Sequence, residues 1–509
     1  MPGNRVIPPT ALIIGIDGGG LDAIEPLVAA GRLPNLATLL GASVHGPTTT
    51  TWPAHTAPGW STFVTAEQPG GHGVFQFFDT QHPEYGDRIT TSAQLGAATV
   101  WHWLADQGYT SGLINVPMSH PALDLPGYQV TWPLVPTLRY SRPPGLIGEL
   151  SAAGVPFTSD LLTMYQGQAD YADRAVGNVA ARRRSIAHLL TTRPADIVMA
   201  VITEVDRVSH HYWHRADPTH PRHDPADPAG RDAITRVYAA VDELVGELLD
   251  LVGEETAVML VSDHGSGPGY THLNVNTALA EAGLLSLGTG HSGPASWFTD
   301  PETGRTVDFA RTTAYMPTPG CNGVNLNLAG RQRLGPVRPA DVRSLTREIT
   351  QLFTEMIDPH SGRPALSAVL SREEAYPGPY CAGAPDLLLV PAVETVLADP
   401  RPARAVWSPS HQTGMHRYTG MWSLRHPALP PSRLAGPVAL HDLAPTLLHV
   451  LGLRRPGDVL GRPVQAVLDG HHESQPLPAS APRPGEVQDE VYLRDHEETR
   501  SILATMGYL

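Results

Sequence analysis

Short apolar runs alternate along the sequence with longer segments of helical periodicity. Runs without polar alternation predict buried parallel strands. Four such runs are Ala11–Ile16, Leu113–Val116, Ile197–Ile202 and Ala257–Val261, and Leu387–Val390 is a fifth candidate. Between Ile234 and Val252, apolar residues recur every three or four positions, which predicts a helix that ends at Gly253. The alternation predicts an α/β fold with a mostly parallel central sheet and helices on both faces.

Polar side chains follow three of the predicted strands. Asp17 follows the first strand, Asp206 and His210 follow the third, and Asp263-His264 follows the fourth. Because ligands bind at the carboxyl ends of strands in open α/β sheets, we expect these five side chains to meet at one edge. Asp206 and His210 are four residues apart, so on a helix they share a face, which suits metal chelation.

Each of these signals also has a purely structural explanation. Asp17 precedes three glycines and could be a turn residue or a helix cap. Asp206 and His210 could be a surface pair, and His211 and His214 are rival ligands nearby. Asp263-His264-Gly265 could be a turn. The combination of all three strand ends favours a metal site over any of these explanations taken alone.

Composition narrows the function classes. Apolar residues make up 41% of the 509-residue chain, enough for a large core, and the net charge of −15 argues against nucleic-acid polymers and anionic membranes as partners. No apolar run approaches the roughly 18 residues of a membrane span. Two cysteines cannot make a disulfide framework, and the first apolar run is too short for a signal peptide, so we expect a cytoplasmic protein.

A threonine-rich segment around Thr56 completes a series of motifs in which the sequence resembles the alkaline phosphatase superfamily. The closest resemblance is to the type I phosphodiesterases and nucleotide pyrophosphatases, including predicted phosphohydrolases and phosphomutases. The matching blocks are Gly15-Ile16-Asp17-Gly18, Thr56-Ala57-Pro58, Phe63-Val64-Thr65, Pro69 to Gly73, Asp206 with His210, Ser262-Asp263-His264-Gly265 and Gly414-Met415-His416. Ala66 stands where this family usually has Gly.

The resemblance implies an alkaline-phosphatase-like fold that holds two divalent metal ions, Zn²⁺ or alternatively Mn²⁺. One ion would be bound by Asp17, Asp263, His264 and Thr56. The other would be bound by Asp206, His210 and His416. His411 lies five residues from His416 and is the rival ligand there. The donor chemistry agrees, since Zn²⁺ accepts carboxylate and imidazole ligands.

Thr56 is the nucleophile that the resemblance implies. A threonine hydroxyl attacks only when a base or a metal activates it. Thr56 precedes Ala57-Pro58, so as a helix N-cap it would lie where backbone N–H groups favour an anion. Thr51 is the alternative, because Thr51-Trp52-Pro53 imitates the same motif, but the spacing to Phe63-Val64-Thr65 favours Thr56. His72 is expected to be architectural, and His55 and His220 to face solvent.

The implied function is two-metal hydrolysis of phosphate esters by a phosphodiesterase or nucleotide pyrophosphatase, through a phosphothreonine intermediate. Phosphomonoesterase or phosphomutase activity is the alternative, with Arg207 as a candidate for the extra positive charge. The partner would be a small, possibly nucleotide-like, phosphate ester. We expect a catalytic core over residues 1–470, with a cap inserted at 286–400, a linker at 471–484 and a docking segment at 485–509.

Overall fold

The computed structural model describes residues 8–132, 140–165, 167–289, 295–300, 302–392, 396–410, 412–468 and 477. The predicted linker and C-terminal docking segment lie outside these residues, apart from Leu477. None of the described helices is both long and apolar enough to cross a membrane.

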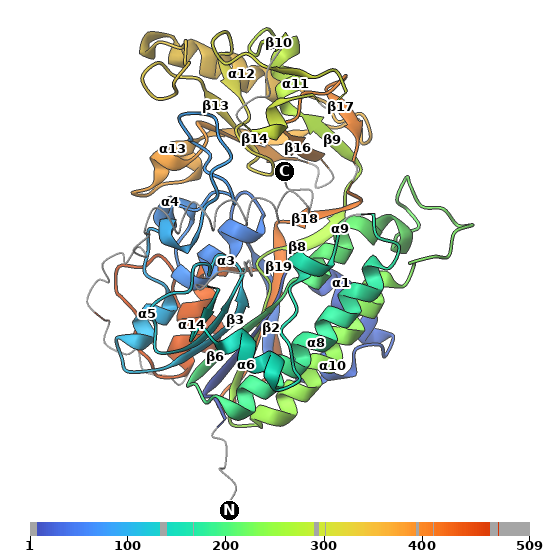
Figure 1. Cartoon of the computed structure of the whole chain (residues 1–509), viewed down its shortest axis with the longest axis vertical. Coiled ribbons are helices and arrows are strands. Elements are labelled where there is room, and N and C mark those ends of the chain that lie inside the picture. Colours follow the sequence, from blue (N-terminus) through green and yellow to red (C-terminus); the bar gives the residue numbers. More distant parts are fainter. Residues whose placement is uncertain are drawn as a thin grey trace, which may run out of the picture.

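A ten-stranded sheet forms the lower part of the molecule in Figure 1. Its strand order is β20 (Ser432–Arg433), β2 (Val44–Thr49), β19 (Thr419–Arg425), β7 (Ala257–Val261), β1 (Ala11–Ile16), β6 (Ile197–Ile202), β3 (Ser111–Val116), β4 (Gly127–Thr131) and β5 (Ser141–Arg142), and β21 (Val438–Ala439) also pairs with β2. The central strands β7, β1, β6, β3 and β4 run parallel, whereas β19 is antiparallel to both its neighbours. The predicted mostly parallel sheet is therefore confirmed.

Helices cover both faces of this sheet, and β1 shows why its sequence is apolar throughout. Leu12 and Ile14 pack on one face with residues of α1 (Leu21–Ala29), α2 (Pro34–Gly41), α6 (Leu146–Ala152), α8 (Tyr171–Thr192) and α10 (Ala233–Val252). Ala11 and Ile13 pack on the other face with α3 (Thr56–Thr65), α5 (Val100–Ala105) and α14 (Leu443–Val450) (Figure 1). Every residue of β1 is buried, because neither face of the strand meets water.

A second layer, which we call the cap, lies above the carboxyl edge of the large sheet in Figure 1. Its sheet has the order β12 (Ala314–Tyr315), β13 (Gly323–Leu326), β15 (Leu387–Pro391) and β14 (Leu366–Ser371), and it packs with α11 (Val275–Glu281) and α12 (Val342–Thr354). A smaller sheet joins β16 (Val396–Asp399), β9 (Thr271–Asn274) and β17 (Trp407–Pro409), and β10 (Leu287–Thr289) pairs with β11 (Arg305–Val307).

The fifth candidate strand, Leu387–Val390, is a strand but not a parallel one. It is β15, and it pairs antiparallel with β13 and β14 in the cap. Leu387 and Leu389 pack into one apolar cluster, and Leu388 and Val390 pack into another. A strand covered on both faces is apolar throughout in either kind of sheet, so the sequence could not distinguish the two.

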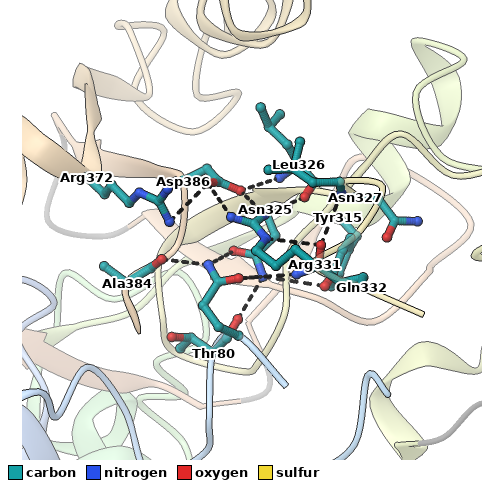
Figure 2. A network of polar contacts seen from close by, with 12 residues as sticks. Thr80, Tyr315, Asn325, Leu326, Asn327, Arg331, Gln332, Arg372, Ala384 and Asp386 are labelled. Carbon is teal, nitrogen blue, oxygen red and sulfur yellow. Dashed lines mark hydrogen bonds and ion pairs between the residues drawn. The ribbon is translucent and has the colours of Figure 1, made fainter. Parts of the chain in front are cut away.

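Polar contacts fasten the cap to a loop of the core (Figure 2). Gln81 donates a hydrogen bond from Nε2 to Asn325 Oδ1 (3.0 Å) and another to the carbonyl of Ala384 (2.6 Å). Asp386 accepts from the Leu326 amide (2.7 Å) and from Arg331 Nη1 (2.8 Å). The Gln81 bonds therefore hold a loop of the core against β13 and the neighbouring Ala384, whereas the Asp386 bonds lie within the cap.

Candidate active site

The ends of three neighbouring strands meet at one edge of the large sheet. In the parallel register, Ile16 of β1 is opposite Ile202 of β6, and Gly15 is opposite Val261 of β7. The residues that follow the three strands therefore emerge side by side. This is the arrangement that the sequence predicted, and the side chains of all seven predicted site residues contact at least one other member of the set.

Thr56 is the first residue of α3, and its hydroxyl faces two of the strand ends. Its Oγ1 lies 3.4 Å from Asp17 Oδ1 and 3.5 Å from His264 Nε2. His55, with an extended backbone, occupies the N-cap position, so the expectation that Thr56 is the N-cap was wrong by one residue. The amide of Thr56 still belongs to the first turn, where N–H groups have no acceptor within the helix. The helix end remains suited to an anion.

Close contact between α3 and the sheet fixes Asp17. Trp60, one turn after Thr56 and fully buried, donates a hydrogen bond from Nε1 to Asp17 Oδ2 (3.1 Å). Gly59 makes the approach possible, since a Cβ there would lie 3.0 Å from the Cβ of Asp263. Asp17 Oδ1 is thus left to face Thr56 and His264, while Oδ2 is held by the indole.

Asp206, His210 and His416 form one side of the site. Asp206 and His210 lie on α9 (Glu204–Ala216), and His416 lies on β18 (Gly414–Arg417), which pairs with β8 (Gly265–Pro268). Asp206 Oδ1 is 3.3 Å from His210 Nε2 and 3.3 Å from His416 Nε2, and the two Nε2 atoms are 3.1 Å apart. The expected pairing of Asp206 with His210 on one helix face is confirmed.

Backbone carbonyls orient both imidazoles. His210 Nδ1 lies 2.7 Å from the Gly414 carbonyl, and His416 Nδ1 lies 2.9 Å from the Ala54 carbonyl. A carbonyl only accepts, so Nδ1 carries the proton in each neutral ring and Nε2 keeps its lone pair. The lone pairs then point toward Asp206, as in histidines that bind metal through Nε2.

His264 joins the two sides of the site. Its Nε2 lies 3.2 Å from Asp263 Oδ2 and 3.5 Å from Asp17 Oδ1, while its ring stacks on that of His416 with centroids 3.9 Å apart. Its Nδ1 is 3.0 Å from the Gly265 carbonyl. Two groups of ligand atoms, each within a 4.8 Å span, share this histidine: Asp17, Asp263 and His264, and Asp206, His264 and His416.

Burial and mutual repulsion disfavour negative charge on two carboxyl groups of the site. Burial, together with the charge of Asp206, raises the pKa of Asp17 well above its usual value. Burial and the charge of Asp17 do the same to the pKa of Asp263. Burial, helped by His416, lowers the pKa of His264 to about 3, so this imidazole is neutral at pH 7. Carboxylates that repel one another beside a neutral imidazole form a site that a cation would stabilise.

The donor set fits divalent metal ions. It combines carboxylate oxygens with imidazole nitrogens, which suit Zn²⁺, and carboxylates also suit Mn²⁺. Asp263 Oδ2 is buried and accepts no hydrogen bond from any described residue, although such oxygens are normally paired. The residues present therefore fit the group that the motifs imply.

Two arginines adjoin the site in sequence, and both are bonded to protein groups. Arg207 Nε lies 3.3 Å from Asp160 Oδ2. Arg417 donates from Nη1 to the His416 carbonyl (3.2 Å) and from Nη2 to the Pro268 carbonyl.

Sequence reasoning missed several residues around the site. His55, expected to face solvent, is buried, and its ring lies edge-on to His416 with centroids 5.1 Å apart. His220, also expected to be exposed, is buried and lies 3.2 Å from the Gly269 carbonyl. Trp60 carried no polar signal in the sequence. His72 behaves as predicted, since it contacts Thr62 Oγ1 (3.0 Å) and accepts from the Val74 amide (3.1 Å).

Residues 11–419 match the family described as type I phosphodiesterase / nucleotide pyrophosphatase. The chain belongs to this family. Membership confirms the resemblance drawn from the motifs and makes the protein a phosphoester hydrolase. No curated protein matches the chain.

Solved structures confirm the fold. A murine ectonucleotide pyrophosphatase / phosphodiesterase 5, in an inactive threonine-to-alanine form bound to AMP, is 15% identical with a TM-score of 0.53, covering 89% of this chain and 96% of its own. Phosphonoacetate hydrolase from Sinorhizobium meliloti 1021, bound to phosphonoformate, is 16% identical with a TM-score of 0.54, covering 88% and 95%. The chain therefore has an alkaline-phosphatase-like fold, as predicted.

Proposed function

We propose that the protein is a two-metal phosphodiesterase that uses Thr56 as its nucleophile. The observation that carries the proposal is the Thr56 hydroxyl, buried at the start of α3 and within 3.5 Å of both Asp17 and His264. A hydroxyl in that position has a carboxyl group and an imidazole on one side and helix amides on the other. The solved murine relative is inactive as a threonine-to-alanine form, which agrees with a nucleophilic threonine in this fold.

The same residues divide into two ligand sets. Asp17, Asp263, His264 and Thr56 would hold one ion, and Asp206, His210 and His416 would hold the other. Bound divalent ions, Zn²⁺ by preference and Mn²⁺ as the alternative, would lower the pKa of the hydroxyl and offset charge on the phosphate. His264 lies within reach of both groups of ligand atoms, so a shift of this one ring would disturb both ions.

Thr56 then performs a double displacement. The Thr56 hydroxyl gives its proton to solvent, its Oγ1 forms a bond to phosphorus as the bond from phosphorus to the leaving oxygen breaks, and the phosphoryl group, with its remaining ester substituent, stays on Thr56. The departing alkoxide takes a proton from water. In the second step a water oxygen attacks the same phosphorus, the bond to Thr56 breaks, and the threonine recovers its proton. The amides of the first turn of α3 would stabilise the phosphothreonine.

Charge favours a diester over a monoester. A monoester carries close to two negative charges at pH 7, so its hydrolysis calls for an extra cationic group. All 35 basic residues of this chain are arginines. Arg207, the candidate for that role, is paired with Asp160, and Arg417 donates to backbone carbonyls. The substrate we propose is therefore a small phosphodiester, which a nucleotide-like compound would satisfy.

The cap would select the leaving group. Its loop between β12 and β13 reaches the site at Gly320, where a Cβ would lie 3.2 Å from His55 Cδ2 and 2.7 Å from Gln76 Nε2. Gly320 has a φ of +68°, so any side chain there is strained as well as crowded. We also propose that the protein is cytoplasmic. Its two cysteines, Cys321 and Cys381, are not joined in a disulfide, as is usual in a reducing compartment.

The test is turnover of bis-p-nitrophenyl phosphate and p-nitrophenyl phosphate by chelator-treated enzyme, with and without added Zn²⁺ or Mn²⁺. The proposal predicts metal-dependent diester turnover that exceeds monoester turnover at least tenfold. It also predicts no turnover by Thr56→Ala and residual turnover by Thr56→Ser. Monoester preference would favour the phosphomonoesterase or phosphomutase alternative. Metal-independent turnover would contradict the proposal.

A further inference from the structure

Directly behind Asp206 lies a cluster of four charged side chains, which we call the buried quartet: Asp160, Arg182, Glu204 and Arg207. Arg182 on α8 is fully buried, and so is Glu204, the first residue of α9. Asp160, in the short helix α7 (Asp160–Thr163), is 1% exposed, and Arg207 is 8% exposed. Nothing in the proposed chemistry uses any of these residues.

The ion pairs of the quartet are short and interlinked. Arg182 Nη2 lies 3.0 Å from Asp160 Oδ1, and Arg182 Nε lies 3.0 Å from Glu204 Oε1. Asp160 Oδ2 in turn lies 3.3 Å from Arg207 Nε. Asp160 therefore bridges two arginines. Breaking such a buried pair by removing one partner leaves an uncompensated charge, which is strongly unfavourable.

The quartet holds in place the part of the chain that carries two proposed metal ligands, Asp206 and His210. Arg182 Nη1 also contacts the Val201 carbonyl (3.4 Å), at the end of β6. Glu204 and Arg207 are separated by one turn of α9, and Asp206 lies between them. The strand end and the first turn of the helix are thus fixed by side chains from α7 and α8.

The quartet also reaches the site through its charge. Arg207 directly follows the proposed ligand Asp206 in α9, and its Nε lies 3.3 Å from Asp160 Oδ2. In the intact protein Asp160 offsets the positive charge of Arg207. Without Asp160, a buried guanidinium would remain beside the positions that two divalent cations are to occupy, and like charges repel strongly in a buried site.

We propose that Asp160 is a positioning residue for the ion at Asp206, His210 and His416, because it orients α9 and neutralises Arg207. The inference rests on the proposed function, since it assumes that these residues bind a cation. It predicts a charge effect that a merely structural role does not. Removal of Asp160 weakens binding of this ion, and removal of Arg207 as well relieves the repulsion and restores binding.

The experiment titrates Zn²⁺ into chelator-treated protein by calorimetry, and follows thermal unfolding of the metal-free forms by circular dichroism. For Asp160→Asn we expect affinity at one site to fall about 10- to 100-fold, in line with other groups that orient metal ligands. The second site should change little. In Asp160→Asn/Arg207→Gln, affinity should recover to within about threefold of Arg207→Gln alone, as a double-mutant cycle would report for a coupled pair.

Glu243→Gln is the matched control. Glu243 accepts from Nη1 of Arg183 (2.8 Å), which follows Arg182 on the same helix, but the Glu243 side chain is 67% exposed. Zn²⁺ binding by Glu243→Gln should equal that of the wild type. A double variant that binds no better than Asp160→Asn would overturn the proposal, because a purely structural network only loses more contacts.

Two further outcomes keep the tests separate. If Asp160→Asn does not fold, Arg207→Gln alone decides: equal or tighter Zn²⁺ binding supports the charge argument, and weaker binding overturns it. If wild-type protein binds no Zn²⁺ and no Mn²⁺, the proposed function itself fails. If the wild type binds two ions and Asp160→Asn binds them equally well, only this inference fails.

Discussion

Replacing Trp60 by Phe would test the proposed metal site independently of the core that supports it. The indole Nε1 donates the 3.1 Å hydrogen bond to Asp17 Oδ2, and Trp60 is fully buried among apolar residues. Phe keeps most of the apolar contacts and removes the donor. Asp17 then loses the bond that holds it in place, and its other oxygen no longer has a fixed direction toward Thr56.

The size of the effect follows from the bond that is lost. A hydrogen bond to a charged group contributes about 1.5–3 kcal/mol, which corresponds to about 10- to 150-fold in an equilibrium constant. Groups that orient metal ligands typically change affinity by about 10–100-fold when mutated, so the two scales agree. We therefore expect Trp60→Phe to weaken binding of the proposed ion at Asp17 by roughly one to two orders of magnitude, and binding of the proposed ion at Asp206 much less.

The assay is competition for Zn²⁺ against a chromophoric chelator, and Trp103→Phe is the control. Trp103 lies in the same apolar cluster, is equally buried, and its Nε1 has no hydrogen-bond partner among the described residues. Both variants remove the same atoms from the core, so Trp103→Phe measures the loss of packing alone, and Trp60→Phe should lower the melting temperature further because it also loses the hydrogen bond to Asp17. If the two variants bind Zn²⁺ equally well, the assignment of Asp17 as an oriented metal ligand is wrong.

Two other perturbations follow from single contacts. In Gly414→Ala, the new Cβ would lie 2.1 Å from the backbone oxygen of Ser209, so β18 must shift. Diester turnover should then fall at least tenfold, which is about 1.4 kcal/mol in the activation free energy. The control is Gly436→Ala, at an exposed position with no atom within 4 Å of the new Cβ, and it should retain full turnover. Burial lowers the pKa of His72 from 6.5 to about 3. Between those pH values the unfolded chain binds one more proton than the folded chain, so stability falls as pH drops through this window, by up to about 1.4 kcal/mol per pH unit. His72→Asn, which keeps an acceptor for the Val74 amide, should flatten that dependence in urea unfolding series, and an unchanged slope would show that His72 does not titrate as assigned.

The sequence predicted the strands that carry the site because their surroundings are uniform. β1, β6 and β7 have the predicted bounds, since strands covered by helices on both faces are apolar from end to end. Polar residues begin where the strands leave this cover, so Asp17 and Asp263 could be located at the edge. Because β1 and β7 are parallel neighbours, Asp17 and Asp263 follow them at the same edge, and their proximity could be predicted from the strands alone.

Other features depended on contacts between segments far apart in the sequence. Leu387–Val390 carried the same apolar pattern as the core strands, although its neighbours are antiparallel strands of the cap. His55 is buried by Phe77 and His416, which lie 22 and 361 residues away. The indole of Trp60 gave no sign that it would meet a carboxylate. Burial of this kind depends on the tertiary fold, which local pattern does not specify.

The central claim is that Thr56 becomes phosphorylated during turnover, and rapid acid quenching tests it most directly. Metal-loaded protein is mixed with excess bis-p-nitrophenyl phosphate, quenched within the first turnovers and digested, and the peptide that spans residues 48–62 is sequenced by mass spectrometry. The account predicts a phosphodiester-derived adduct on Thr56 that is absent from Thr56→Ala and from chelator-treated enzyme. An adduct on Thr51, or full diester turnover by Thr56→Ala, would contradict it.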